Sequence, residues 1–138
     1  MSKNVAAWRL GLKRSTAILS LGLLFTNSVA SLASEVPISL RIKVESSNGK
    51  ITAWKVNCNP NGGNHPAVAK SCNLLESTRG KSLLFPKTKD ICTQIYGGAA
   101  KASIKGKYGE AKVALTLSRE DGCKIKQWDN LLTLLRSK

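Results

Sequence analysis

The sequence predicts an α+β fold in which a small antiparallel β-sheet is covered by helix. Three observations predict this class. Apolar and polar residues alternate along several short segments, glycine-containing turns join those segments as hairpins, and one stretch after Pro66 has helical spacing. The chain has no internal repeat and a length suited to one domain.

Residues 1–33 have the features of a secretory signal and are expected to lie outside the fold. A basic leader precedes an apolar run over residues 17–25, and small residues follow at positions suited to signal cleavage. The apolar run is too short to span a bilayer. We expect cleavage after Ala33, with Ala30 as the alternative, and therefore a secreted, extracellular domain of residues 34–138.

The first hairpin is expected directly after the signal. Residues 37–45 alternate between apolar and polar side chains, which predicts a half-buried strand. Asn48-Gly49 favours a tight turn because both residues readily adopt positive backbone angles. A second strand over residues 50–58 then pairs antiparallel with the first. The apolar residues expected on the buried faces are Ile38, Leu40, Ile42, Val44, Trp54, Val56 and Cys58.

A helix is expected over residues 67–79, after a loop rich in asparagine and glycine. Pro66 fits the first turn of this helix, and Gly80 is expected to end it. His65 is the one histidine of the chain. It is predicted to be a helix-entry residue instead of a catalyst, because a catalytic histidine needs a nucleophile and an orienting partner. The apolar side of the helix carries Val68, Cys72 and Leu75.

A second hairpin is expected over residues 101–118. Side chains alternate on both sides of Tyr108-Gly109-Glu110, which predicts two strands joined by a turn. The final segment, residues 124–135, admits a short helix followed by a strand from Asn130. Its pattern does not separate helix from strand.

The four cysteines all follow the predicted signal. An even number in a short exported chain predicts two disulfides, for which three pairings are possible. There is no Cys-x-x-Cys pair, and His65 has no cysteine at zinc-finger spacing, so we expect no metal and no cofactor. The cysteines are Cys58, Cys72, Cys92 and Cys123.

Basic residues dominate the charge. The chain carries 22 Lys+Arg and 8 Asp+Glu, and removal of the signal leaves 18 basic residues and a net charge of +10. This balance favours acidic partners such as anionic proteins, cell-wall polymers, nucleic acid or membrane surfaces. The alternative is that dispersed lysines only solvate a small domain. The sequence lacks a block of five like charges and the interleaved aromatics that stack bases, so no specific nucleic-acid binding is expected.

The segment from Asp90 to Gly98 is the candidate contact with a partner. It begins beside a cysteine, ends in two glycines, and carries uncharged residues suited to an extended backbone: Thr93, Gln94, Ile95 and Tyr96. An uncharged, extended peptide with one end pinned is what a protease cleft accepts. The alternative is an ordinary short strand with Ile95 in the core.

The order of these features resembles the Streptomyces-type subtilisin inhibitor family over nearly all of the predicted domain. Two parts of the pattern are the most specific. One is the His65-Pro66 pair, which begins seven residues before Cys72. The other is the run in which Cys92 is followed by two residues, an aliphatic residue and Tyr96. The complete pattern is Cys58, Gly-Gly-Asn-His65-Pro66-Ala67, Cys72, Cys92-Thr-Gln-Ile-Tyr96, a basic hairpin and Cys123.

The resemblance implies a structure and an activity. The expected disulfides are Cys58–Cys72 and Cys92–Cys123, in a five-stranded antiparallel sheet with two short helices, usually as a homodimer. The expected activity is inhibition of serine proteases by a substrate-like loop, with no enzymatic activity of its own.

The resemblance also implies that the scissile bond of the loop is Gln94–Ile95. Ile91, Cys92 and Thr93 then lie upstream of this bond, and Tyr96 lies downstream. The chain departs from the family where aspartate-proline usually follows the tyrosine, since Gly97-Gly98 stands there. Because glycine is freer than proline, we expect a less rigid downstream side and weaker inhibition.

Gln94 favours subtilisin-like targets. Trypsin-like pockets end in a carboxylate and select lysine or arginine, whereas subtilisins accept varied residues and gain from an apolar group upstream, here Ile91. The family also contains trypsin-directed members. The main rival function is a secreted basic domain that binds polyanions or cell surfaces without inhibiting a protease. An enzyme is the weaker rival, because one histidine and no clustered carboxylates leave no recognisable acid-base pair.

Overall fold

The structure is a computed structural model that describes residues 35–87 and 91–136. The expected signal, residues 1–33, lies outside the described residues, as does Asp90. Within the described ranges, no helix has the length and apolar composition needed to cross a membrane.

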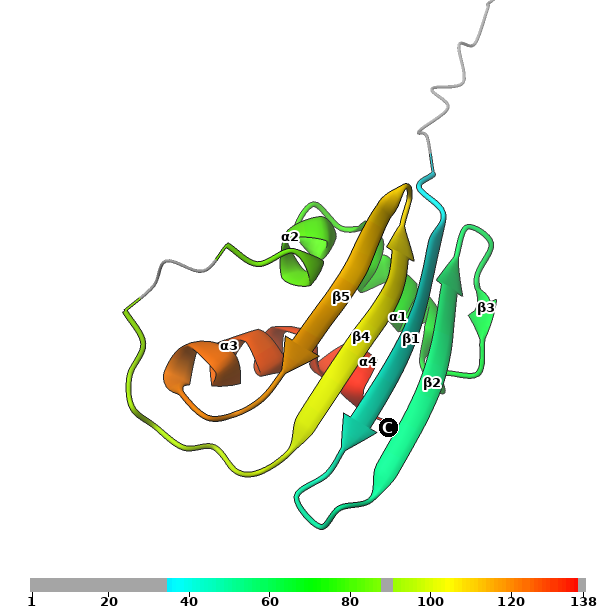
Figure 1. The fold of residues 1–138 in the computed structure, drawn as a ribbon. Helices are drawn as coiled ribbons and strands as arrows, with labels where there is room; N and C mark the ends of the chain where they lie inside the picture. Colours follow the sequence, from blue (N-terminus) through cyan, green and yellow to red (C-terminus); the bar gives the residue numbers. More distant parts are fainter. Residues whose placement is uncertain (1–34, 88–90, 137–138) are drawn as a thin grey trace, which may run out of the picture. The chain divides into compact units, whose positions relative to one another are not determined.

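The sheet has five antiparallel strands in the order β3-β2-β1-β4-β5 (Figure 1). Both expected hairpins are confirmed: β1 pairs with β2, and β4 pairs with β5. β1 lies at the centre because the second hairpin docks β4 against its free edge. The strands are β1 (Ile38–Glu45), β2 (Ile51–Cys58), β3 (Gly62–Gly63), β4 (Lys101–Tyr108) and β5 (Ala111–Leu117).

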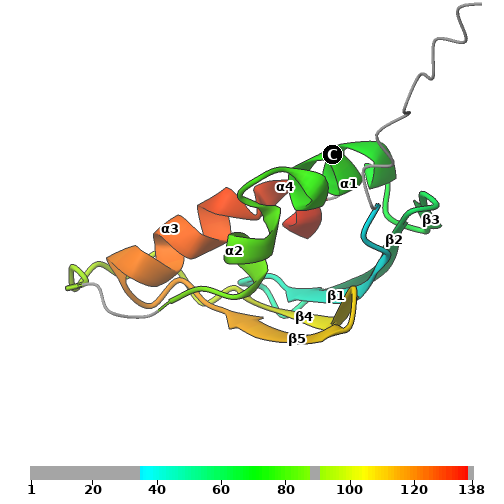
Figure 2. The same cartoon turned by 90° about the horizontal axis from the view of Figure 1, so that it is seen from above.

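In the part of the chain that the structure describes, four helices cover one face of the sheet (Figure 2), where two were expected. Gly80 follows the turn after the first helix and is the first residue of a second helix. The carbonyl of Leu75 lies so close to Gly80 that a Cβ would not fit there. The segment after Asn130 is a helix and not the strand that the pattern also admitted. The helices are α1 (Val68–Glu76), α2 (Gly80–Leu84), α3 (Gly122–Asn130) and α4 (Leu132–Leu135).

The core lies between the sheet and the helices. Alternate residues of β1, β4 and β5 point inward, so one face of each strand is buried and the other is exposed. The helices close this face with fully buried leucines from α1 and α4. Core residues with almost no exposed surface include Leu40, Ile42, Leu75, Ile104, Val113, Leu117, Leu131 and Leu134.

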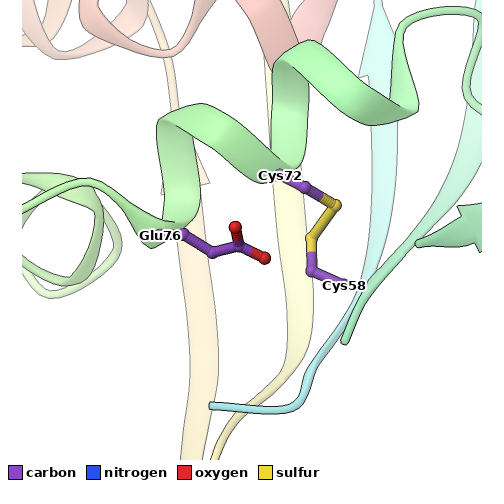
Figure 3. Close-up of side chains that lie close together, drawn as sticks. All are labelled: Cys58, Cys72 and Glu76. Atoms are coloured by element: carbon purple, nitrogen blue, oxygen red, sulfur yellow. A yellow bond between two sulfur atoms is a disulfide. The ribbon is translucent and has the colours of Figure 1, made fainter. Parts of the chain in front are cut away.

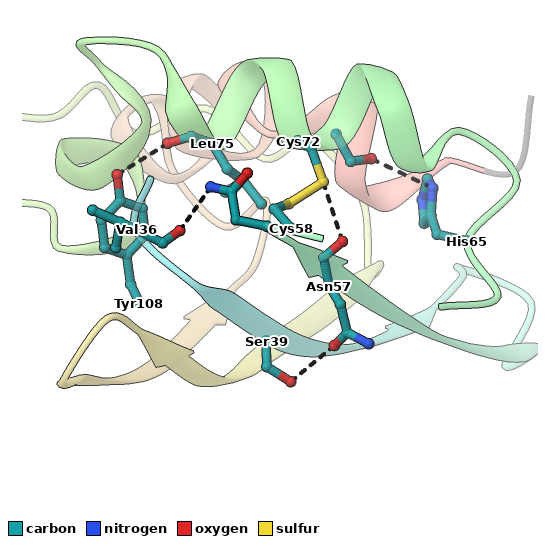
Figure 4. Close-up of a disulfide and its surroundings, with 10 residues drawn as sticks. Val36, Ser39, Asn57, Cys58, His65, Cys72, Leu75 and Tyr108 are labelled. Atoms are coloured by element: carbon teal, nitrogen blue, oxygen red, sulfur yellow. Dashed lines mark hydrogen bonds between the residues drawn. A yellow bond between two sulfur atoms is a disulfide. The ribbon is translucent and has the colours of Figure 1, made fainter. Parts of the chain in front are cut away.

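The first disulfide joins the end of β2 to the middle of α1 through Cys58 and Cys72, as the family resemblance implied (Figure 4). The hydroxyl of Tyr108 donates to the carbonyl of Leu75 at 3.3 Å, which ties the end of β4 to the same helix. Together these contacts hold α1 across the sheet.

His65 connects the entrance of α1 to the C-terminal helix α4. Its Nδ1 accepts from the N–H of Ala67 at 3.0 Å, so the proton of the neutral ring lies on Nε2, which donates to the carbonyl of Leu134 at 3.2 Å. The ring is 4% exposed and meets Trp54 edge-on at 5.1 Å. The prediction of a helix-entry residue is therefore confirmed, with an additional contact that the sequence did not indicate.

Protonation of His65 is expected to destabilise the fold. Burial lowers the pKa of His65 below its usual value, and the hydrogen bond to Leu134 only partly opposes this. Since the unfolded state binds the proton more tightly, stability is fully present above the unfolded pKa of about 6.5 and is lost as pH falls toward the folded pKa. Urea unfolding should show a lower midpoint at pH of about 5.5 than at about 7.5, and His65→Gln should remove this difference. A wild-type midpoint that does not change across this interval would contradict the prediction.

Candidate functional site

The candidate segment is an exposed loop. Residues 91–98 contain no strand, and the side chains of Ile91, Ile95 and Tyr96 are 103%, 57% and 67% exposed. The alternative of an ordinary strand with Ile95 in the core is therefore wrong. Large apolar side chains held in solvent are available for a partner to cover.

The upstream end of the loop is tied to the segment that begins α3. The disulfide Cys92–Cys123 is formed, as the family resemblance implied. Beside it, the N–H of Gly122 donates to the carbonyl of Thr93 at 2.9 Å. A Cβ at Gly122 would collide with the side-chain hydroxyl of Thr93, so glycine allows this close approach while Thr93 keeps its side-chain position.

A tight turn lies at the centre of the loop. The N–H of Ile95 donates to the carbonyl of Thr93 at 2.9 Å, which closes a three-residue turn around Gln94. The carbonyl of Thr93 thus accepts two N–H groups, one from the loop and one from Gly122. Because Gln94 itself is exposed, the turn presents its side chain to solvent while the flanking backbone is held.

The downstream end is tied to Arg119, in the connection between β5 and α3. The N–H of Gly97 donates to the carbonyl of Arg119 at 2.7 Å, and the Nε of Arg119 donates back to the carbonyl of Gly97 at 2.8 Å. The guanidinium is positioned in turn by Asp129, 3.6 Å away, and by the ring of Trp128, whose centroid lies 5.8 Å from it. The backbone and side chain of one residue therefore hold Gly97.

The start of α3, where Cys123 and Gly122 lie, is itself stabilised by charge. The carboxylate of Asp121 caps the helix by accepting from the N–H of Lys124 at 2.9 Å. The ammonium of Lys124 lies 3.0 Å from Glu120 and 3.3 Å from Asp121. These hydrogen bonds hold the pKa of Glu120 and the pKa of Asp121 below their usual values.

The loop is held by these bonds and not by burial. An open groove of about 1450 Å³ lies beside its upstream half, with Ile91, Cys92 and Thr93 on one side and residues of β5 and α3 on the other. Within residues 35–87 and 91–136, the loop is tied by the disulfide and by the hydrogen bonds to residues 119–122.

The family model for subtilisin inhibitor-like proteins matches residues 35–120, which contain the whole sheet and the loop. The chain belongs to the subtilisin inhibitor-like family. The match ends just before Cys123, the residue to which this loop is bonded. A comparison with curated proteins finds no significant match.

Measured against the family pattern, the two glycines after Tyr96 are accommodated specifically and are not simply loose. A Cβ at Gly97 would lie 2.8 Å from the Cδ1 of Ile125 and 3.1 Å from the Nε of Arg119. Gly98 has φ +108°, a conformation that side-chain-bearing residues rarely adopt. Proline needs φ near −65°, so proline at position 98 would not fit the backbone that the structure has there.

Replacing Gly97-Gly98 by Asp-Pro is therefore expected to weaken protease inhibition. Backbone strain of about 1–3 kcal/mol at position 98 would weaken the hydrogen bonds between Gly97 and Arg119. A loss of this size in binding free energy corresponds to roughly tenfold or more in the inhibition constant. Inhibition constants of Gly97→Asp and Gly98→Pro separately would assign the loss, which should be greater for proline. Tighter inhibition by the double variant would show that the unbound loop is free at these positions.

Two clusters bring cysteines near a carboxylate, and both have a disulfide at their centre. One joins Cys58, Cys72 and Glu76 (Figure 3), and the other joins Cys92, Asp121 and Cys123. A metal would bind the thiolate form of cysteine, whereas these sulfurs are bonded to each other. Each cluster then offers one carboxylate, which is not a metal site.

Sequence reasoning missed Arg119 and Gly122. Arg119 had no signal, because it lies far from the loop in sequence and comes directly after the expected hairpin of residues 101–118. Gly122 carried a weak signal, since it lies directly before Cys123 in the sequence. Gly122 contacts the loop through its backbone N–H, and Arg119 through both its backbone carbonyl and its side-chain Nε. The loop partners of these bonds are backbone groups, which side-chain patterns do not reveal.

Proposed function

We propose that the protein is a secreted inhibitor of subtilisin-like serine proteases, with Gln94–Ile95 as the scissile bond of a substrate-like loop. The observation that carries the proposal is the double tie of an exposed loop to one short segment, residues 119–123. The family supports an inhibitor and a serine protease partner. An inhibitor, and not an enzyme, is therefore the proposed role.

Slow hydrolysis follows from where the ties lie. Cleavage between Gln94 and Ile95 would produce two new ends, one held through Cys92 and Thr93 and the other through Gly97. Both ends remain attached to residues 119–123, so they stay close enough to be rejoined. Order that exists before binding also does not have to be lost on binding, which favours tight association.

Recognition would use the exposed side chains and the backbone beside them. The residues that flank the turn at Gln94 would pair with an exposed strand edge of the partner, as extended peptides do, while side chains enter pockets. Gln94 would occupy the primary pocket, and the fully exposed Ile91 would reach an apolar pocket further upstream. An uncharged residue in the primary pocket favours subtilisin-like over trypsin-like targets.

Titration of subtilisin with purified, oxidised residues 34–138 tests the proposal. We expect activity to fall linearly to a stoichiometric end point, and mass spectrometry of the long-incubated complex to find a single cut at Gln94–Ile95. Rapid digestion of the chain, or inhibition with a cut elsewhere, would contradict the assigned loop. Sedimentation of the same sample would test the homodimer that the resemblance implies.

A further inference from the structure

The face of the sheet opposite the helices is uncovered and strongly basic. All four helices lie on the other face (Figure 2), and alternate residues of β1, β2, β4 and β5 point into solvent. We call the following six residues the basic sheet face: Arg41, Lys43, Lys55, Lys105, Lys107 and Lys112.

Strand register places several of these cations directly opposite each other. Arg41 at the centre of β1 pairs with Lys55 on β2 and with Lys105 on β4, which forms a row across three strands. Lys107 pairs with Lys112 on β5. Neighbouring strands lie about 4.8 Å apart, and like charges directly opposite each other are destabilising. The fold keeps this arrangement at a cost in stability.

Acidic residues do not neutralise the basic sheet face. On the outward positions of β1, β2, β4 and β5, the one carboxylate is Glu45, at the end of β1 and opposite Lys101. Among the described residues, the side-chain ion pairs within 4.0 Å involve Arg119 and Lys124, near the loop. The charge of this face is therefore available to a partner.

A second copy of the chain is a poor occupant of this face. Symmetric packing of two sheets would bring each row of cations against the same row of its partner, and desolvated like charges oppose association strongly. If the expected homodimer forms, it has to use another surface.

We propose that the basic sheet face binds a linear phosphate polymer. Rows of cations at regular strand spacing complement closely spaced phosphates, and lysine is an effective point-charge partner for phosphate. The outward positions of these described strands carry no aromatic side chain, so bases would gain no stacking. The centre of the face is also separate from the loop. Arg41 lies four residues, or about 13 Å, from Glu45, the end of β1 that lines a pocket together with Tyr96.

Binding of long-chain inorganic polyphosphate to purified residues 34–138 tests the proposal. The face variant is Arg41→Gln with Lys55→Gln and Lys105→Gln. The control variant removes the same charge from exposed positions on the helical side, by Lys70→Gln with Arg79→Gln and Lys81→Gln. We expect the face variant to lose at least about tenfold in affinity at fixed salt and the control much less. The salt dependence of log K should fall in slope by roughly two to three for the face variant only.

Each other result has a defined meaning. Equal losses in both variants would overturn the proposal, because binding would then follow net charge and not this face. If single-stranded DNA or vesicles of anionic lipid bind more tightly per phosphate than polyphosphate does, a linear phosphate polymer without bases is not the preferred ligand and the proposal is wrong. The face variant should unfold at the same or a higher temperature than wild type and inhibit subtilisin equally well. That last comparison keeps this proposal independent of the inhibitory function.

Discussion

Replacing Cys92 and Cys123 together by alanine is expected to turn a slowly cleaved inhibitor into a rapidly cleaved substrate of subtilisin. The disulfide is the covalent tie on the upstream side of Gln94, and an open groove lies beside it among the described residues. The remaining hydrogen bond from Gly122 to Thr93 contributes only about 1 kcal/mol. After cleavage the upstream end would separate, and religation would fail.

The other disulfide provides a matched control. Replacing Cys58 and Cys72 by alanine removes a bridge between β2 and α1. In the strand order, β2 is separated by β1 and β4 from β5, the strand that precedes the partners of the loop. In the chain-entropy model the two bridges stabilise the fold by similar amounts, roughly 3 kcal/mol for Cys58–Cys72 and 4 kcal/mol for Cys92–Cys123. At a temperature where both double variants are folded, cleavage rates measured by mass spectrometry should rise steeply only for the Cys92/Cys123 variant. Equal cleavage rates would show that global stability, and not the local tie, prevents hydrolysis.

Much of the fold could be predicted from the sequence because its signals are local. Alternation along residues 37–45 set which side of β1 is buried, and Asn48-Gly49 fixed the turn that pairs it with β2. The family resemblance then supplied what local patterns could not, the choice among three disulfide pairings, and both pairs are formed.

The features that escaped prediction depend on contacts between distant residues. Gly80 was interpreted as a stop signal, but its role is to let the chain pass against the carbonyl of Leu75. The segment after Asn130 is helical because α4 supplies buried leucines to the core, which periodicity over four residues cannot indicate. Arg119 belongs to the site only because β5 ends beside the loop.

Gly97-Gly98 shows the same limit, because the sequence indicates the freedom of two glycines but not the contacts that they make. From sequence, two glycines mean many unbound conformations. In the structure, Gly97 makes two hydrogen bonds with Arg119, and a Cβ at this position would collide with Ile125. Gly98 takes a backbone angle that proline cannot adopt. Freedom in the isolated peptide is therefore a poor guide to freedom in the folded loop.

The substitution Gln94→Lys is expected to create a trypsin inhibitor without changing the fold. Gln94 is exposed at the centre of its turn, so an added charge meets only solvent in the free protein. In a complex with trypsin, the lysine would pair with the carboxylate at the base of the primary pocket, which glutamine leaves unpaired. Such a buried pair contributes several kcal/mol relative to an unpaired carboxylate, and each ~1.4 kcal/mol is tenfold in the inhibition constant.

Asn73→Lys is the matched control, because it adds the same charge at an exposed amide position on α1. Inhibition constants for trypsin and subtilisin should be measured for wild type and both variants at one salt concentration. We expect trypsin inhibition to tighten by at least about tenfold for Gln94→Lys and to stay unchanged for Asn73→Lys. If both lysines act equally, trypsin responds to the overall charge of the domain. If neither acts, or if the cut in the complex falls elsewhere, Gln94 does not enter the primary pocket and the assigned scissile bond is wrong.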